Sequence, residues 1–136
     1  MSHEEKNIRY QIFFRESEFM FDHTVTVCDD KFEHPAPADD ILDWCKLEYK
    51  QCPNCTLSPI WHKYCPLAVR LIPFVNLPEC NSYDEVRAEV TMESKTILAE
   101  TSAQEAFSSL LGLVMATSGC PHTSFFKPMA WYHQPF

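Results

Sequence analysis

Glycine, long apolar runs and familiar catalytic motifs are scarce or missing in this chain. Only two of its 136 residues are glycine, and no glycine-rich phosphate loop, H-E-x-x-H or G-x-S-x-G motif occurs. No apolar run reaches the roughly 18 residues of a membrane-spanning helix. The first residues, MSHEEKNIRY, are charged and lack the apolar segment of a secretory signal. These absences favour a non-enzymatic cytoplasmic protein without membrane association.

Lysine and arginine are also few. The chain has 11 basic and 19 acidic residues, a formal net charge of −8, and its basic residues are scattered. Proteins that bind nucleic acid or an anionic membrane surface need a basic patch on the binding face. We therefore expect neither a nucleic acid nor a membrane as partner.

Cysteine, by contrast, is abundant. The chain has seven cysteines, an odd number, and no export signal, which favours reduced thiols over a disulfide framework. The hydrophobic fraction of 46% and the aromatic fraction of 13% are typical of a globular protein. We expect a single domain over residues 1–136.

The segment QCPNCTLSPIWHKYCP, residues 51–66, and the later GCPH, residues 119–122, predict a metal centre. Cys52 and Cys55 form a C-x2-C knuckle, and Cys52, Cys65 and Cys120 each precede a proline. Proline restricts the backbone and holds a thiolate-bearing turn open. Four thiolates suit tetrahedral zinc or an iron–sulfur cluster. We expect zinc, with a cluster as the alternative, bound by Cys52, Cys55, Cys65 and Cys120.

Two histidines provide a second ligand set. His62 stands three positions before Cys65, so Cys52, Cys55, His62 and Cys65 form a purely local zinc knuckle. His122 is then a neighbour that supports a ligand, and it also stays a candidate ligand itself. The other three cysteines lie alone in apolar company and are expected in the core: Cys28, Cys45 and Cys80.

The Cys52-Pro53-Asn54-Cys55 motif permits a different function. It resembles the C-P-x-C site of glutaredoxins, in which the first cysteine is a nucleophile at a helix N-terminus. A thiol–disulfide oxidoreductase is therefore the alternative to a metal-binding module. Pro59 argues against the following helix that such a site requires.

Alternating apolar and polar residues predict four strands in two hairpins. The first hairpin joins residues 8–14 to residues 19–27, and the second joins residues 85–92 to residues 96–99. Such strands pack one face and leave the other in water, which favours an antiparallel sheet.

Residues 101–118 predict one long amphipathic helix. Thr101 with Gln104, or Ser102 with Glu105, fits a capping box, and apolar residues follow at helical spacing. Gly112 inside this helix predicts close packing of another group against the backbone, because glycine costs about 1 kcal/mol there. Gly119 suits the left-handed position that ends a helix.

Together these patterns predict an α+β fold: a small antiparallel sheet of two hairpins, one long helix packed on it, and a cysteine-rich metal loop. Residues 1–28 form the N-terminal hairpin, 29–40 a linker rich in charge and proline, and 41–136 the cysteine-rich core. The aromatic tail, residues 123–136, either completes the core or binds a partner. We expect a structural or interaction module with a protein partner, or a homodimer.

The motifs CPNC, YCPLA and ATSGCPH give the chain a family resemblance from about residue 47 to its C-terminus. In these motifs it resembles a family of small bacterial proteins that share a domain of unknown function. The resemblance implies a bacterial cytoplasmic origin. It also draws attention to Cys52, Cys55, Cys65, Cys120 and His122, and it implies no activity.

Overall fold

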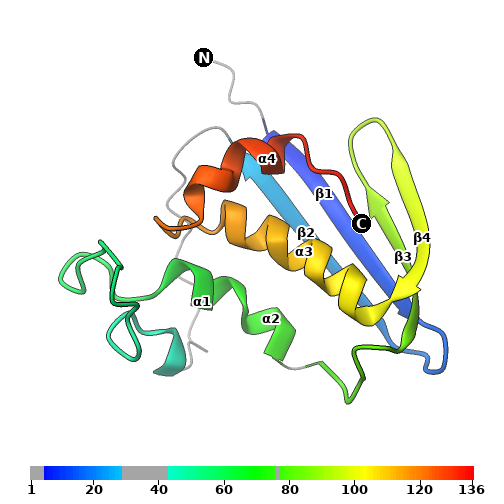
Figure 1. The fold of residues 1–136 in the computed structure, drawn as a ribbon, viewed down its shortest axis with the longest axis horizontal. Coiled ribbons are helices and arrows are strands. Elements are labelled where there is room, and N and C mark those ends of the chain that lie inside the picture. Colours follow the sequence, from blue (N-terminus) through cyan, green and yellow to red (C-terminus); the bar gives the residue numbers. More distant parts are fainter. Residues whose placement is uncertain (1–4, 29–42, 76) are drawn as a thin grey trace.

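The structure is a computed structural model that describes residues 5–28, 43–75 and 77–136. Four antiparallel strands form one sheet in the order β2-β1-β3-β4, and helices cover it (Figure 1). The α+β class is therefore confirmed, whereas the predicted linker, residues 29–40, lies outside the described residues. The strands are β1 Glu5–Phe14, β2 Met20–Cys28, β3 Glu85–Thr91 and β4 Thr96–Ser102.

The two predicted hairpins join through their inner strands. β1 pairs with β3 in antiparallel register, with Tyr10 opposite Val90 and Ile12 opposite Ala88. The N-terminal hairpin is thus part of the same sheet as the hairpin formed by β3 and β4. β1, the first strand in the sequence, lies in the interior of the sheet.

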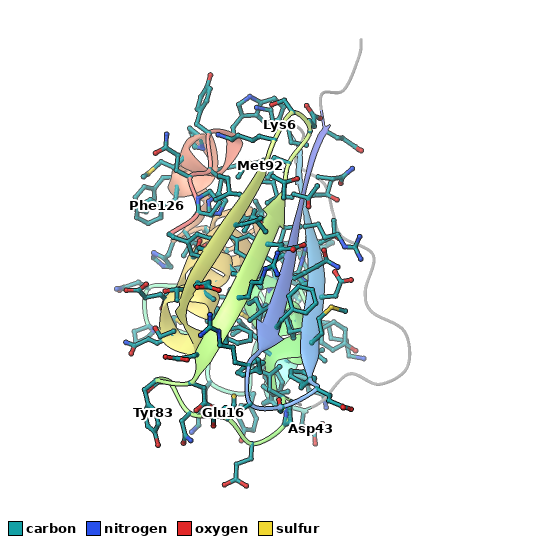
Figure 2. All side chains as sticks on the ribbon, turned by 90° about the vertical axis from the view of Figure 1, so that its right-hand side faces the viewer. Lys6, Glu16, Asp43, Tyr83, Met92 and Phe126 are labelled. Atoms are coloured by element: carbon teal, nitrogen blue, oxygen red, sulfur yellow. The ribbon has the colours of Figure 1, made fainter. Side chains whose placement is uncertain are left out.

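The two faces of the sheet differ sharply in polarity. Residues that point toward the helices are apolar and buried, including Ile8, Ile12 and Val90. The opposite face carries polar pairs such as Arg9 with Asp22, whose closest nitrogen and oxygen atoms are 2.5 Å apart. Seen edge-on in Figure 2, the helices lie on one side of the sheet only. This is the arrangement that the period-two alternation predicts.

The longest helix, α3, spans Ala103–Thr117 and packs on the apolar face. The Ser102 side chain accepts a hydrogen bond of 3.3 Å from the Glu105 backbone N–H, which confirms the second of the two predicted caps. The predicted end is also correct, because Gly119 has a φ of 92° just beyond the C-cap Ser118. The residues that α3 buries are Ala103, Ala106, Leu110, Leu113, Val114, Ala116 and Thr117.

The close packing predicted at Gly112 is wrong. A Cβ added at Gly112 would meet no atom within 4 Å beyond the backbone of its own helix. At Gly119, by contrast, the positive φ strains any residue other than glycine.

We therefore expect Gly112→Ala to raise the free energy of unfolding by up to about 1 kcal/mol, because alanine loses less entropy in a helix. The same change at Gly119 should lower it by about 1–2 kcal/mol. Urea denaturation of both variants measures the two shifts, and a destabilised Gly112→Ala would contradict the open space at this position.

Shorter helices flank α3 on both sides in the sequence. None of the helices in the described ranges is long and apolar enough to cross a membrane. Before β3 the chain forms a 3₁₀ turn η1 Asp43–Cys45, then α1 Pro66–Arg70 and α2 Ile72–Val75. After α3 come the 3₁₀ turn η2 Ser124–Phe126 and α4 Lys127–Trp131.

Candidate functional site

The predicted metal loop is a series of turns that projects from the sheet and α3 (Figure 1). The Cys52–Cys55 knuckle is one tight turn, in which the Cys55 N–H donates to the Cys52 carbonyl at 2.9 Å. A second turn follows, with the His62 N–H donating to the Ser58 carbonyl at 2.8 Å. The loop therefore places Cys52 and Cys55 on one turn, as a C-x2-C knuckle requires.

The end of the loop returns to its beginning. The Cys65 N–H donates to the Cys45 carbonyl at 2.7 Å, and the Leu47 N–H donates to the Lys63 carbonyl at 3.0 Å. Cys65 is the N-cap of α1, whose first residue is Pro66. Proline is well tolerated at the first helical position because its missing N–H would be unpaired there in any case. The Cys65-Pro66 step thus starts a helix immediately after the loop.

The GCPH motif at the end of α3 lies against the loop. The His122 ring nitrogen Nε2 is 2.5 Å from the Asn54 carbonyl oxygen inside the Cys52–Cys55 turn. A Cβ on Gly119 would be 3.8 Å from the Cβ of Pro66, which follows Cys65. The structure thus brings together the three Cys-Pro segments that the sequence singles out, although the last is more than fifty residues from the others.

The contact with Asn54 also identifies the proton on His122. A backbone carbonyl can only accept a hydrogen bond, so Nε2 of His122 carries the hydrogen. In the neutral ring, Nδ1 then has a free lone pair. Histidines that bind a metal through one nitrogen usually donate the other N–H to a carbonyl or carboxylate. His122 is therefore arranged as such a ligand would be, with Nδ1 as the available atom.

The thiols of these segments do not converge in this structure. Cys52 is exposed, Cys55, Cys65 and Cys120 are half-buried, and all four are free. His62, which the local ligand set requires, is exposed. Within residues 5–28, 43–75 and 77–136, no group of three or more His, Cys, Asp or Glu side chains is placed to hold a metal ion. The metal centre and its ligand set remain predictions.

The cysteines outside the predicted ligand set behave differently. Cys45 is fully buried, and Cys80 is partly buried against the core, as expected for cysteines that act as small apolar residues. The side chain of Cys28 lies outside the described part of the structure. Cys45 is therefore confirmed as a buried residue, whereas Cys80 packs against the core and stays partly exposed.

The local geometry offers little to the oxidoreductase alternative. A lowered thiol pKa in C-x-x-C enzymes comes largely from a helix that begins at the first cysteine. Here Cys52 lies on a turn, and the next helix in the described chain, α1, begins only at Pro66. Cys52 therefore does not begin a helix, as the first cysteine of such a site does.

A buried polar cluster elsewhere was not predicted from the sequence. The Tyr10 side chain is fully buried, and its hydroxyl is hydrogen-bonded to Ser109 Oγ at 2.7 Å and to His133 Nε2. Burial raises the pKa of Tyr10 to about 12, and the bond to Ser109 opposes this shift. Burial also lowers the pKa of His133. No local sequence pattern marks His133, because only tertiary structure brings the tail to β1.

Comparison with known proteins gives a family and no function. No curated protein and no solved structure matches the chain. A family model described as a domain of unknown function, DUF6901, matches residues 8–136 and so extends well before the segment in which the sequence motifs suggested a resemblance. Because this match covers nearly the whole length, the chain belongs to the DUF6901 family.

Proposed function

We propose that this protein is a metal-binding structural and interaction module in which one zinc ion joins the Cys52–Cys65 loop to the end of α3. The proposed ligands are Cys52, Cys55, Cys65 and Cys120. His122 supports the site through its bond to Asn54, or replaces one thiolate through Nδ1. An iron–sulfur cluster is the alternative occupant of the same thiolates.

The observation that carries this proposal is that the loop has no fully buried side chain of its own, and that its base rests on two buried residues, Cys45 and Leu47. Throughout residues 48–75 no side chain is buried, and neither α1 nor α2 buries a residue. Phe74 in α2 packs against the core, but a segment whose side chains all stay partly exposed gains less of the free energy that ordering its backbone requires. Small folds without a sufficient core are commonly held by a metal or by disulfides. Disulfides are disfavoured here by the odd number of cysteines, seven in the chain.

The contacts between the motifs give independent support. Asn54 with His122, and Gly119 with Pro66, already hold the three cysteine-bearing segments side by side. Zinc–sulfur bonds are about 2.3 Å long, so binding requires the four thiols to turn toward a common point. That change involves side chains on turns and a helix end, which adjust more readily than residues inside the sheet.

The interaction role rests on exposed apolar side chains at two places. Phe125 and Met129 in the tail are each 68% exposed, and the Phe125 and Phe126 rings lie 4.1 Å apart. Ile60 and Trp61 at the tip of the cysteine loop are 86% and 83% exposed. Exposed apolar groups gathered in this way mark protein interaction sites. A metal that orders the loop would also orient Trp61 toward a protein partner or a second copy.

Metal analysis of protein purified without oxygen tests the proposal. We expect one zinc per chain in colourless protein. Cys52→Ser and Cys120→Ser should each weaken zinc binding by more than about 100-fold, since even the loss of a group that only supports a ligand costs 10–100-fold. Cys80→Ser, a matched change outside the ligand set, should bind zinc like the parent chain.

Two other results would decide against zinc. Broad visible absorption together with bound iron would assign the thiolates to a cluster. Absence of both metals from the parent chain, under conditions in which it is folded, would reject the metal centre altogether.

A further inference from the structure

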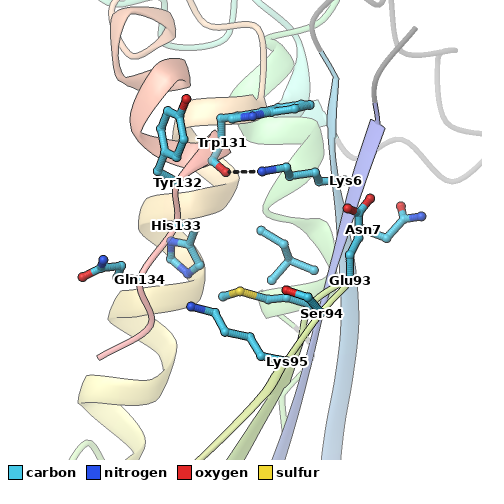
Figure 3. A pocket seen from close by; sticks show the side chains of 11 residues that line it. Lys6, Asn7, Glu93, Ser94, Lys95, Trp131, Tyr132, His133 and Gln134 are labelled. Atoms are coloured by element: carbon cyan, nitrogen blue, oxygen red, sulfur yellow. Dashed lines mark hydrogen bonds between the residues drawn. The ribbon is translucent and has the colours of Figure 1, made fainter. Parts of the chain in front are cut away.

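A second site lies apart from the proposed metal ligands, none of which lines it. A pocket of about 300 Å³ opens where β1 begins, where β3 turns into β4 and where α4 leads into the C-terminal segment. Lys6 and Met92, from two of these segments, lie together at this end of the sheet in Figure 2. Figure 3 shows the pocket from close by. Its volume is at the lower end of the range for small-molecule sites.

The pocket is cationic in an otherwise acidic protein. Lys6 and Lys95 both line it, and Glu93 is the acidic residue in its wall. The net charge of the whole chain is −8. Lys95 forms no hydrogen bond or ion pair through its ammonium group within the described residues, and its side chain points toward His133 in Figure 3. A lysine left unpaired in a partly enclosed site is available to an anion.

Aromatic rings form the other wall. The Lys6 ammonium lies 4.4 Å from the centre of the Trp131 ring and 5.6 Å from that of Tyr132, and it donates to the Trp131 carbonyl at 3.1 Å. Ile8, which is buried, and Met92 add apolar surface. Planar rings stack on such walls, whereas a cation held over the aromatic face favours a negatively charged substituent nearby.

One polar member of the pocket is held firmly in place. His133 bonds through Nε2 to the buried Tyr10 hydroxyl, which also bonds to Ser109. The Phe136 backbone N–H donates to the same Ser109 oxygen at 3.3 Å. These bonds fix the C-terminal segment on β1 and α3, so the His133 side of the pocket exists before a ligand arrives. Pre-formed sites lose less entropy on binding.

We propose that this pocket binds a small organic anion: a planar ring that carries a phosphate or a carboxylate. The anionic group lies between Lys95 and Lys6, whose ammonium covers the face of the Trp131 ring, and the ligand ring lies beside it against Met92. This site is independent of the metal centre, since none of the proposed metal ligands lines it.

Titration of the full-length, isotopically labelled protein with phenyl phosphate, followed by NMR, tests the proposal. We expect saturable shifts at Lys95, Trp131 and His133, with a Kd of about 1 mM, typical for a ligand of this size. Lys95→Gln should weaken binding about tenfold, because it removes one charged hydrogen bond. Lys95→Arg should largely keep it. Lys50→Gln removes the same charge on the far cysteine loop and should bind like the parent chain.

The probes separate the possible ligands. Benzoate binding as tightly as phenyl phosphate would assign the site to carboxylates, and much weaker benzoate binding would assign it to phosphates. Benzylamine binding as tightly as phenyl phosphate would overturn the proposal, since charge would then play no part. The proposal would also be overturned if Lys95→Gln bound phenyl phosphate as tightly as the parent chain does and had the same melting temperature.

Discussion

Leu110→Ala is expected to lower the free energy of unfolding by about 2–5 kcal/mol, the range for large-to-small changes at buried leucines. Leu110 lies in the middle of α3 and is 0% exposed. It belongs to the cluster formed by α3 and the apolar face of the sheet, in which Tyr10 and Ile12 are also fully buried. Alanine leaves a cavity that a rigid sheet cannot close. Since small domains are stable by only about 5–15 kcal/mol, the loss is a large share of the total.

Leu98→Ala is the matched control for this core variant. Leu98 is 56% exposed in β4, and its change should alter stability by no more than about 0.5 kcal/mol. Urea denaturation of both variants gives the two changes in the free energy of unfolding, provided that the dependence of that free energy on urea concentration has the same slope in both. If the variants differ by less than about 1 kcal/mol, α3 is not packed on the sheet as the structure describes.

Local sequence patterns predict the elements of this fold well and their arrangement poorly. Period-two alternation identifies the four strands, and the cap at Ser102 identifies the start of α3, because each signal lies within a few neighbouring residues. The pairing of β1 with β3 is set by burial of both strands under one helix, and no local pattern encodes it. The sequence assigns no secondary structure to the apolar run at residues 67–77, because a proline such as Pro73 generally argues against a helix. In the structure, Pro73 lies within the first turn of α2, where proline is tolerated.

The two candidate sites also differ in how far the sequence predicts them. The spacing of Cys52, Cys55 and Cys65 marks the loop directly, since knuckles are local. That His122 contacts Asn54 could be expected only from the shared Cys-Pro step, a weaker signal. The pocket beside Lys95 is invisible in the sequence, because its three walls come from the start of β1, the turn after β3 and the tail. Sites assembled from distant segments of the chain need the tertiary structure.

Removing the metal is expected to loosen the cysteine loop and leave the sheet intact. Zinc at 100–1,000 times its Kd stabilises the state that binds it by about 2.7–4.1 kcal/mol. Of residues 48–75 only Phe74 packs against the core, and it is partly exposed, whereas β1, β3 and α3 share a fully buried core. A chelator should therefore speed hydrogen exchange of the Cys65 and Val69 amides about 100–1,000-fold. These amides donate to the Cys45 and Cys65 carbonyls at 2.7 and 3.1 Å, at the base of the loop.

The Met92 amide is the internal reference for this experiment, because it donates to the Lys95 carbonyl at 2.8 Å in the turn between β3 and β4, a part of the sheet that holds none of the proposed metal ligands. Its exchange should change little on chelation, and Cys80→Ser should respond to the chelator like the parent chain. Exchange of Cys65 and Val69 that is unaffected by chelation would show that no metal holds the loop. An equal acceleration at Met92 would mean instead that the ion supports the whole domain, because opening of the loop alone leaves the hydrogen bonds of the sheet in place.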